Sequence, residues 1–136
     1  MLAKHISLAE FFALWFDIKS YKTIKMTYDK IYFPYPSTDK NKKFFIITNQ
    51  GKKIRFGAKS YQHFTEIHMD EERKIRYLNR HKKREDWEDP NTAGYWSRWF
   101  LWEYPTYKEA YEKIKKDLLM KGYITKEQYK KNIWKG

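Results

Sequence analysis

The histidines of the chain lie too irregularly to indicate a metal site. Three of them, His63, His68 and His81, fall in one region, but no two have the i, i+4 spacing that places metal ligands on one helix face. The chain has no cysteine that could join them as a thiolate ligand or serve as a nucleophile. We therefore expect these side chains to be structural or exposed, and we expect no bound metal.

Four carboxylates follow one another closely at Glu85, Asp86, Glu88 and Asp89. Such a cluster can hold Mg²⁺ for nuclease chemistry or do acid–base work, and that reading remains the less favoured alternative. Asp89 before Pro90 has the form of a helix N-cap followed by proline at the first helical position. We expect the other acids to offset the nearby arginines and lysines.

Sequence motifs of common enzyme classes are missing from the chain. It contains no glycine-rich phosphate loop, no G-x-S-x-G and no H-E-x-x-H. These observations predict a protein without catalytic residues, cofactor or small-molecule substrate.

The most informative charged segment is a helix predicted from residue 70 to 84. It ends in a dense basic run, and its apolar stripe is so narrow that most of the helix must face solvent. Arginine forms bidentate contacts with phosphate or carboxylate, so the partner is either a nucleic-acid backbone or an acidic patch on a protein. The residues predicted to make this contact are Arg73, Arg76, Arg80, Lys83 and Arg84.

Tryptophans dominate a second predicted helix, which should begin at Asp89–Pro90 and end near Glu103. Trp96, Trp99 and Trp102 recur every third residue, and with Phe100 and Leu101 they cover nearly the whole helix circumference. Each alone should be buried in the core, but a small domain can leave some of them for a partner. Stacking of single-stranded bases is the competing use of such rings.

The N-terminal segment is predicted to be an amphipathic helix, within residues 1–19. Ser7 and Glu10 form a capping box, and the apolar face includes Phe11, Phe12 and Trp15. The stretch is too short and too charged to span a bilayer. We expect this face to pack on the core or to bind a partner.

Strands are predicted between residues 23 and 57. Apolar residues alternate at 24–28 and 31–33, an apolar run occupies 44–48, and a turn signal at 49–51 leads into alternation at 54–56. The proline-containing stretch 34–43 reads as a loop. These patterns predict an antiparallel meander of about three strands, with one apolar and one lysine-rich face.

Three to four helices should follow in residues 70–135. After the basic and tryptophan helices, Thr106 and Glu109 form a capping box before an apolar stripe that ends at Gly122, and a last short helix begins at Thr125. We predict an α+β fold in a single domain over residues 1–136.

Charge is distributed unevenly along the 136 residues, whose formal net charge is +12. Residues 52–84 hold 11 basic and 4 acidic side chains, whereas residues 85–105 hold 1 and 5. Aromatic residues make up 20% of the chain, which excludes a disordered polycation. The partner should therefore be acidic, although it need not be a nucleic acid.

Part of the chain, from about residue 51 to 106, resembles a family of short uncharacterised proteins encoded by giant nucleocytoplasmic DNA viruses. The resemblance is carried by Gly51-Lys-Lys-Ile-Arg-Phe-Gly-Ala-Lys59 and by three elements in close order, Arg-His-Lys-Lys (80–83), Asp-Pro-x-Thr-Ala-Gly (89–94) and Ser-Arg-Trp (97–99). It implies a viral origin and brings no catalytic residues.

Together these observations predict a non-enzymatic structural protein of the virus particle, a minor capsid component that cements or bridges capsid proteins. It would be made in the host cytoplasm and lie on the inner face of the capsid shell, held by the aromatic and basic residues named above. The alternative is a basic protein that binds the viral genome. An exposed apolar patch would favour the first function, and an exposed basic groove without such a patch would favour the second.

Overall fold

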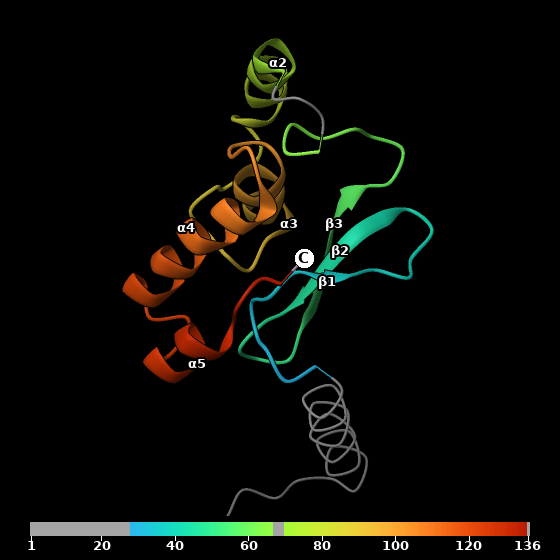
Figure 1. Cartoon of the computed structure of the whole chain (residues 1–136). Coiled ribbons are helices and arrows are strands. Elements are labelled where there is room, and N and C mark those ends of the chain that lie inside the picture. Colours follow the sequence, from blue (N-terminus) through green and yellow to red (C-terminus); the bar gives the residue numbers. More distant parts are fainter. Residues whose placement is uncertain (1–27, 67–69, 136) are drawn as a thin grey trace, which may run out of the picture.

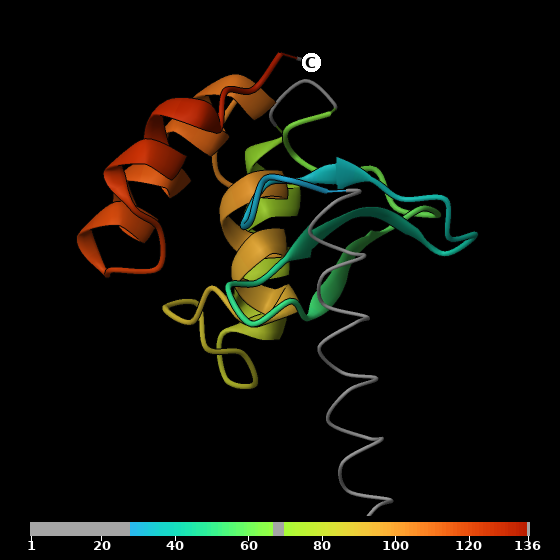
Figure 2. The same cartoon turned by 90° about the horizontal axis from the view of Figure 1, so that it is seen from below.

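The computed structural model describes residues 28–66 and 70–135, and the predicted N-terminal helix and the strand at 24–26 lie outside them. A three-stranded antiparallel sheet is followed by helices, so the α+β prediction is confirmed. The helices α3 (Ala93–Trp96) and η1 (Ser97–Leu101) lie between the sheet and α4 (Tyr107–Met120), and α2 (Glu71–His81) lies at the edge of the fold (Figure 1). Figure 2 shows the same order from below.

The sheet has the order β1 (Tyr35–Pro36), β2 (Lys42–Ile47) and β3 (Lys53–Ala58). Phe44 faces Phe56 and Ile46 faces Ile54 across β2 and β3, and these pairs turn toward the helices. The two longer strands confirm the predictions at 44–48 and 54–56. The short β1 lies inside the stretch predicted as a loop.

The predicted strand at 31–33 is wrong, because the chain turns at Ile31 and Tyr32. Tyr32 has a left-handed φ of 49°, which costs free energy for a residue with a side chain. Distant contacts hold it there: its N–H donates to the carbonyl of Ile47 at 2.8 Å, and its carbonyl accepts from the Tyr111 hydroxyl at 2.9 Å.

The second face of the sheet is not the lysine-rich surface that the alternation predicts. Phe45 and Ile47 lie on that face beside Arg55 and Lys53, and both apolar side chains are buried. Tyr28 and Tyr35 pack against the ring of Phe45, and the Lys53 ammonium lies 4.1 Å from its centre. Aromatic packing therefore covers part of this face.

The core lies between the sheet and α4. Phe100 contacts Phe44 and Phe56 from one side, and the buried stripe of α4 includes Tyr111, Ile114 and Leu118, as its spacing predicts. A short α5 (Lys126–Lys131) follows with a complete capping box between Thr125 and Gln128. Among the described helices, none combines the length and the apolar character needed to cross a bilayer.

The tryptophan helix begins three residues later than predicted. Thr92, not Asp89, is the N-cap, and its hydroxyl accepts from the Tyr95 N–H. Asp89 instead accepts from the Asn91 N–H, and the Pro90 carbonyl accepts from the Trp96 indole at 2.9 Å. The Asp–Pro pair therefore forms a turn that leads into the helix.

Candidate functional site

Helix α2 is attached to the rest of the fold mainly through one buried ring. Asp70 caps it by accepting from the Arg73 N–H, and Tyr77 is its one buried residue. The Tyr77 ring stacks on Trp102 at a centroid distance of 4.4 Å and an angle of 4°, and on His81 at 4.4 Å. The other side chains of the helix are thus half-buried or exposed.

An ion pair between Lys74 and Glu103 fastens the inner side of α2 to the segment after η1. Glu103 accepts from Lys74 at 3.0 Å and from the nearly buried Arg98 at 2.6 Å. Burial of Glu103 opposes its ionisation, but these two cations outweigh burial and hold the carboxyl pKa below its ordinary value. Arg73 is also on this side, half-buried, with its guanidinium 5.8 Å from the centre of the Trp102 ring. Arg73 is therefore less available to a partner than the sequence suggests.

Helix α2 and the turn after it carry five exposed cations, here called the basic edge: Arg76, Arg80, Lys82, Lys83 and Arg84. Arg76 is 57% exposed and only 3.9 Å from Glu72, a weak surface pair. The other four have no ion-pair partner within residues 28–66 and 70–135. Four of the five predicted basic contact residues are therefore exposed, and they lie close together in sequence between residues 76 and 84.

A groove of about 330 Å³ opens between α2 and the sheet, next to the basic edge, and we call it the α2 groove. Its walls come from β2 and β3, from the loop after β3, from α2 and from the start of α3. Cations, aromatic rings and small residues all contribute, including Lys42, Tyr61, Arg80, Gly57 and Ala93. Because the groove joins segments far apart in sequence, no local spacing could have revealed Lys42 and Tyr61.

The end of α2 is fixed in this groove by Glu85. One of its oxygens accepts from His81 Nδ1 at 2.7 Å, and the other accepts from the Trp87 indole at 2.9 Å. Gly94 on α3 makes room for this carboxylate, because a Cβ there would lie 2.9 Å from a Glu85 oxygen. Both oxygens of Glu85 are thus engaged by donors of the protein itself.

His63 lines the groove from the loop after β3 and is buried. Burial, together with the nearby Lys43 ammonium, lowers the His63 pKa to about 4, against the opposing effect of the Glu66 carboxylate. Its Nδ1 lies 2.8 Å from Lys43 Nζ and 2.9 Å from Glu66. The imidazole is therefore neutral at pH 7 and packs as part of the wall.

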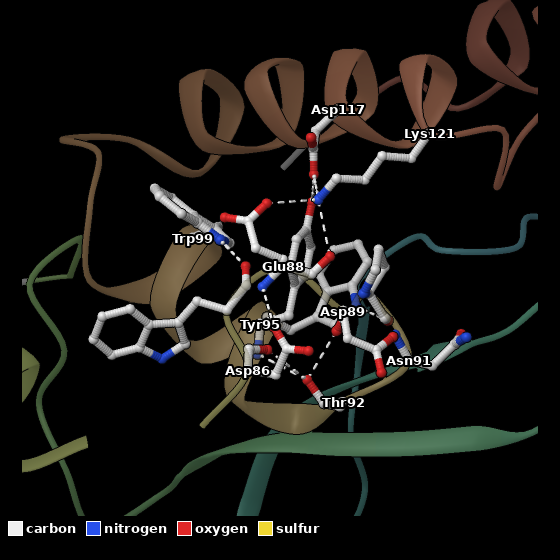
Figure 3. A network of polar contacts seen from close by, with 12 residues as sticks. Asp86, Glu88, Asp89, Asn91, Thr92, Tyr95, Trp99, Asp117 and Lys121 are labelled. Carbon is white, nitrogen blue, oxygen red and sulfur yellow. Dashed lines mark hydrogen bonds and ion pairs between the residues drawn. The ribbon is translucent and has the colours of Figure 1, made fainter. Parts of the chain in front are cut away.

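The acidic segment does not pair with the basic edge as the sequence suggests. Asp86 and Asp89 accept backbone N–H groups of their own turns, whereas Glu88 pairs with Lys121 of α4 at 3.2 Å (Figure 3). Asp117 accepts from the Tyr95 hydroxyl at 2.7 Å and also pairs with Lys121. Over the described residues, no group of three potential ligands is placed to hold a metal ion.

Two of the three tryptophans predicted to face a partner are instead buried in the core. Trp96 is 0% exposed and Trp102 is 2% exposed, so neither can contact another molecule. The π-helical geometry of η1 contributes, because its wider turn breaks the three-residue spacing expected of an α-helix. Trp99 remains half-buried, with its indole donating to the Trp87 carbonyl at 2.7 Å. The other predicted aromatic contacts, Phe11, Phe12 and Trp15, lie outside the described residues.

Comparisons with known proteins add one finding. Residues 35–81 match the model of a family of unknown function, DUF5754. The match runs from β1 to the end of α2, so it contains the whole sheet, all of α2 and most of the residues that line the α2 groove. Neither the curated proteins nor the solved structures include a match to the chain. The similarity thus groups α2 with the sheet and leaves the function to be argued from the surface.

Proposed function

We propose that the chain is a non-enzymatic protein that binds nucleic acid through the phosphate backbone, using the basic edge of α2. The observation that carries the proposal is that Arg80, Lys82, Lys83 and Arg84 are exposed together without ion-pair partners among the described residues. Clustered exposed cations of this kind bind phosphates by releasing counterions, with little dependence on base sequence.

The scatter of the exposed apolar residues along the described part of the chain supports this function over an adhesive one. The large apolar side chains that are exposed there are Tyr61, Ile75, Met120 and Ile133, which are 50%, 54%, 86% and 48% exposed. They belong to separate segments: a loop, α2, α4 and the stretch after α5. Single exposed apolar residues are ordinary on protein surfaces, whereas an assembly surface needs a contiguous patch.

The proposal is tested by fluorescence anisotropy with labelled single-stranded and double-stranded DNA and RNA. We expect binding at 50 mM salt that weakens steeply as salt is raised, with dissociation constants of about 10⁻⁴ to 10⁻⁶ M at physiological ionic strength. Absence of binding to all four probes at low salt would overturn the proposal.

A second candidate function is the minor capsid component that the sequence favours, bound to neighbouring capsid proteins inside a large DNA virus particle. A small hollow of about 190 Å³ supports it, because half-buried Trp99 and Tyr104 line it with Ile114 and could receive a neighbour's side chain. Fractionation of purified virions tests this candidate. Recovery with the shell supports it, and recovery only with the genome or the soluble core excludes it.

A further inference from the structure

The α2 groove has space for a small planar ligand that bears an anion. Its volume is about 330 Å³, and glycine or alanine occupies several lining positions, among them Gly57, Ala58, Ala93 and Gly94. Gly57 has a φ of +79°, which favours glycine, and a Cβ there would lie 2.9 Å from a Leu101 side-chain carbon, so the backbone itself forms the wall at that point. A nucleobase with its sugar and phosphate is of comparable size.

The charges that face the groove favour a phosphate. Lys42 of β2 and Arg80 of α2 line it, and neither has an ion-pair partner in the part of the chain that the structure describes. The one carboxylate in the lining, Glu85, already accepts from His81 and Trp87. The neutral His63 adds no charge, so the cations dominate.

An exposed aromatic ring in the lining favours a base. The Tyr61 side chain is 50% exposed in the loop after β3, so one of its surfaces is free. Tyr77 and Trp102 stack on one another in the inner wall and are buried, so Tyr61 is the exposed aromatic ring that the lining offers to a base. Stacking on such rings is the usual way in which proteins hold unpaired bases.

We propose that the α2 groove binds one nucleotide of a single strand, with its base beside Tyr61 and its phosphate between Lys42 and Arg80. The inference rests on the proposed function, since the basic edge next to the groove would hold the adjoining phosphates of the same strand. A base in a duplex is paired and stacked between its neighbours, so it cannot enter the groove unless it is flipped out of the duplex. The protein should therefore prefer single strands and unpaired ends to closed duplexes.

The direct test is a titration of the full chain, labelled with ¹⁵N, by deoxythymidine 5′-monophosphate. We expect the backbone N–H signals of Gly57 and Gly94 to shift, while that of Gly122, at the far end of α4, does not. Shifts of equal size with inorganic phosphate at the same concentration would overturn the nucleotide proposal in favour of a simple anion site. Shifts with hexaglutamate but not with the nucleotide would overturn it in favour of an acidic protein partner.

Matched variants locate the site. Tyr61→Ala should weaken single-strand binding about tenfold through lost stacking, and Tyr61→Phe should change it by less than about twofold. Lys42→Gln should weaken it more than Lys40→Gln, because Lys40 is exposed on the same hairpin but does not line the groove. Equal effects within either pair would contradict the assignment.

Filling the groove gives an independent measurement. Ala93 is exposed at the start of α3, so Ala93→Phe places a ring in the groove without disturbing the core. The thermal midpoint should stay within a few degrees, and the preference for a single strand over a closed hairpin should disappear. If the variant binds both forms but keeps the preference, the groove proposal fails while the proposed function stands. If the unaltered protein binds neither form, the proposed function itself fails.

Discussion

Removal of two charges from the basic edge should change the salt dependence of binding by a predictable amount. The double variant Lys83→Gln/Arg84→Gln alters the turn after α2, where both side chains are exposed and distant from the core. The matched control, Lys116→Gln/Lys130→Gln, removes the same charge from exposed positions on α4 and α5. Because the net charge of +12 falls equally in both variants, only the location of the lost charge differs.

The magnitude follows from the number of available cations. If the four unpaired cations of the basic edge each neutralise one phosphate of a single strand, the slope of log K against log salt is about −3, at about −0.7 per contact. Loss of two contacts halves the slope to about −1.4. Both proteins should bind equally at 1 M salt, where counterion release vanishes. At 0.1 M salt the double variant should therefore bind about 25-fold more weakly than the unaltered protein.

The assay is fluorescence anisotropy with a labelled 12-nucleotide single strand between 50 and 200 mM NaCl. Over this range the unaltered protein should lose about 50-fold in affinity and the double variant about sevenfold. The α4/α5 control should keep a slope near that of the unaltered protein. Equal slopes for the two double variants would refute the argument, because binding would then depend on net charge and not on the basic edge.

Two further predictions concern the core and the buried histidine. Trp96→Ala should lower the free energy of unfolding by about 3–5 kcal/mol in a urea titration, with a much smaller loss for half-buried Trp99→Ala; similar losses would mean that Trp96 is not in the core. Because the His63 pKa falls from 6.5 to about 4 on folding, the unfolded chain binds more protons between these values, and stability should fall by up to about 3 kcal/mol as pH falls through this window. His63→Gln should remove this dependence and His81→Gln should keep it, as measured by urea unfolding at several pH values.

Helices with local start signals could be predicted from the sequence. Thr106 caps α4 and its apolar residues recur at helical spacing, so the helix follows from residues within one turn of each other. Asp70 caps α2 for the same reason. The turn at Ile31 and Tyr32 could not be predicted, because the hydrogen bond from Tyr111 that holds it spans 79 positions in the chain.

The sequence predicts the exposure of most of the basic residues but not the burial of Trp96 and Trp102. The basic edge is visible in sequence because α2 has too few apolar residues to bury more than one face. Burial of Trp96 and Trp102 depends on the π-helical turn and on packing against residues such as Phe56 and Tyr77. The periodicity of the sequence predicts neither of these. For this reason, the number of tryptophans in the sequence overstates the aromatic surface that a partner can reach.

Residues 85–103 have mainly architectural roles in this fold. Thr92 caps α3, Gly94 makes room for Glu85, and Arg98 bonds Glu103 while its guanidinium lies 4.3 Å from the centre of the Trp99 ring. These contacts set the position of α2 relative to the sheet, and therefore the width of the α2 groove. The chemical character of the groove comes from elsewhere, since Lys42 and Tyr61 belong to residues 35–81, which match DUF5754. The shape of the groove and its ligand chemistry thus depend on different parts of the chain. A relative that keeps residues 85–103 but replaces Lys42 and Tyr61 should retain the groove and lose the ability to bind a nucleotide.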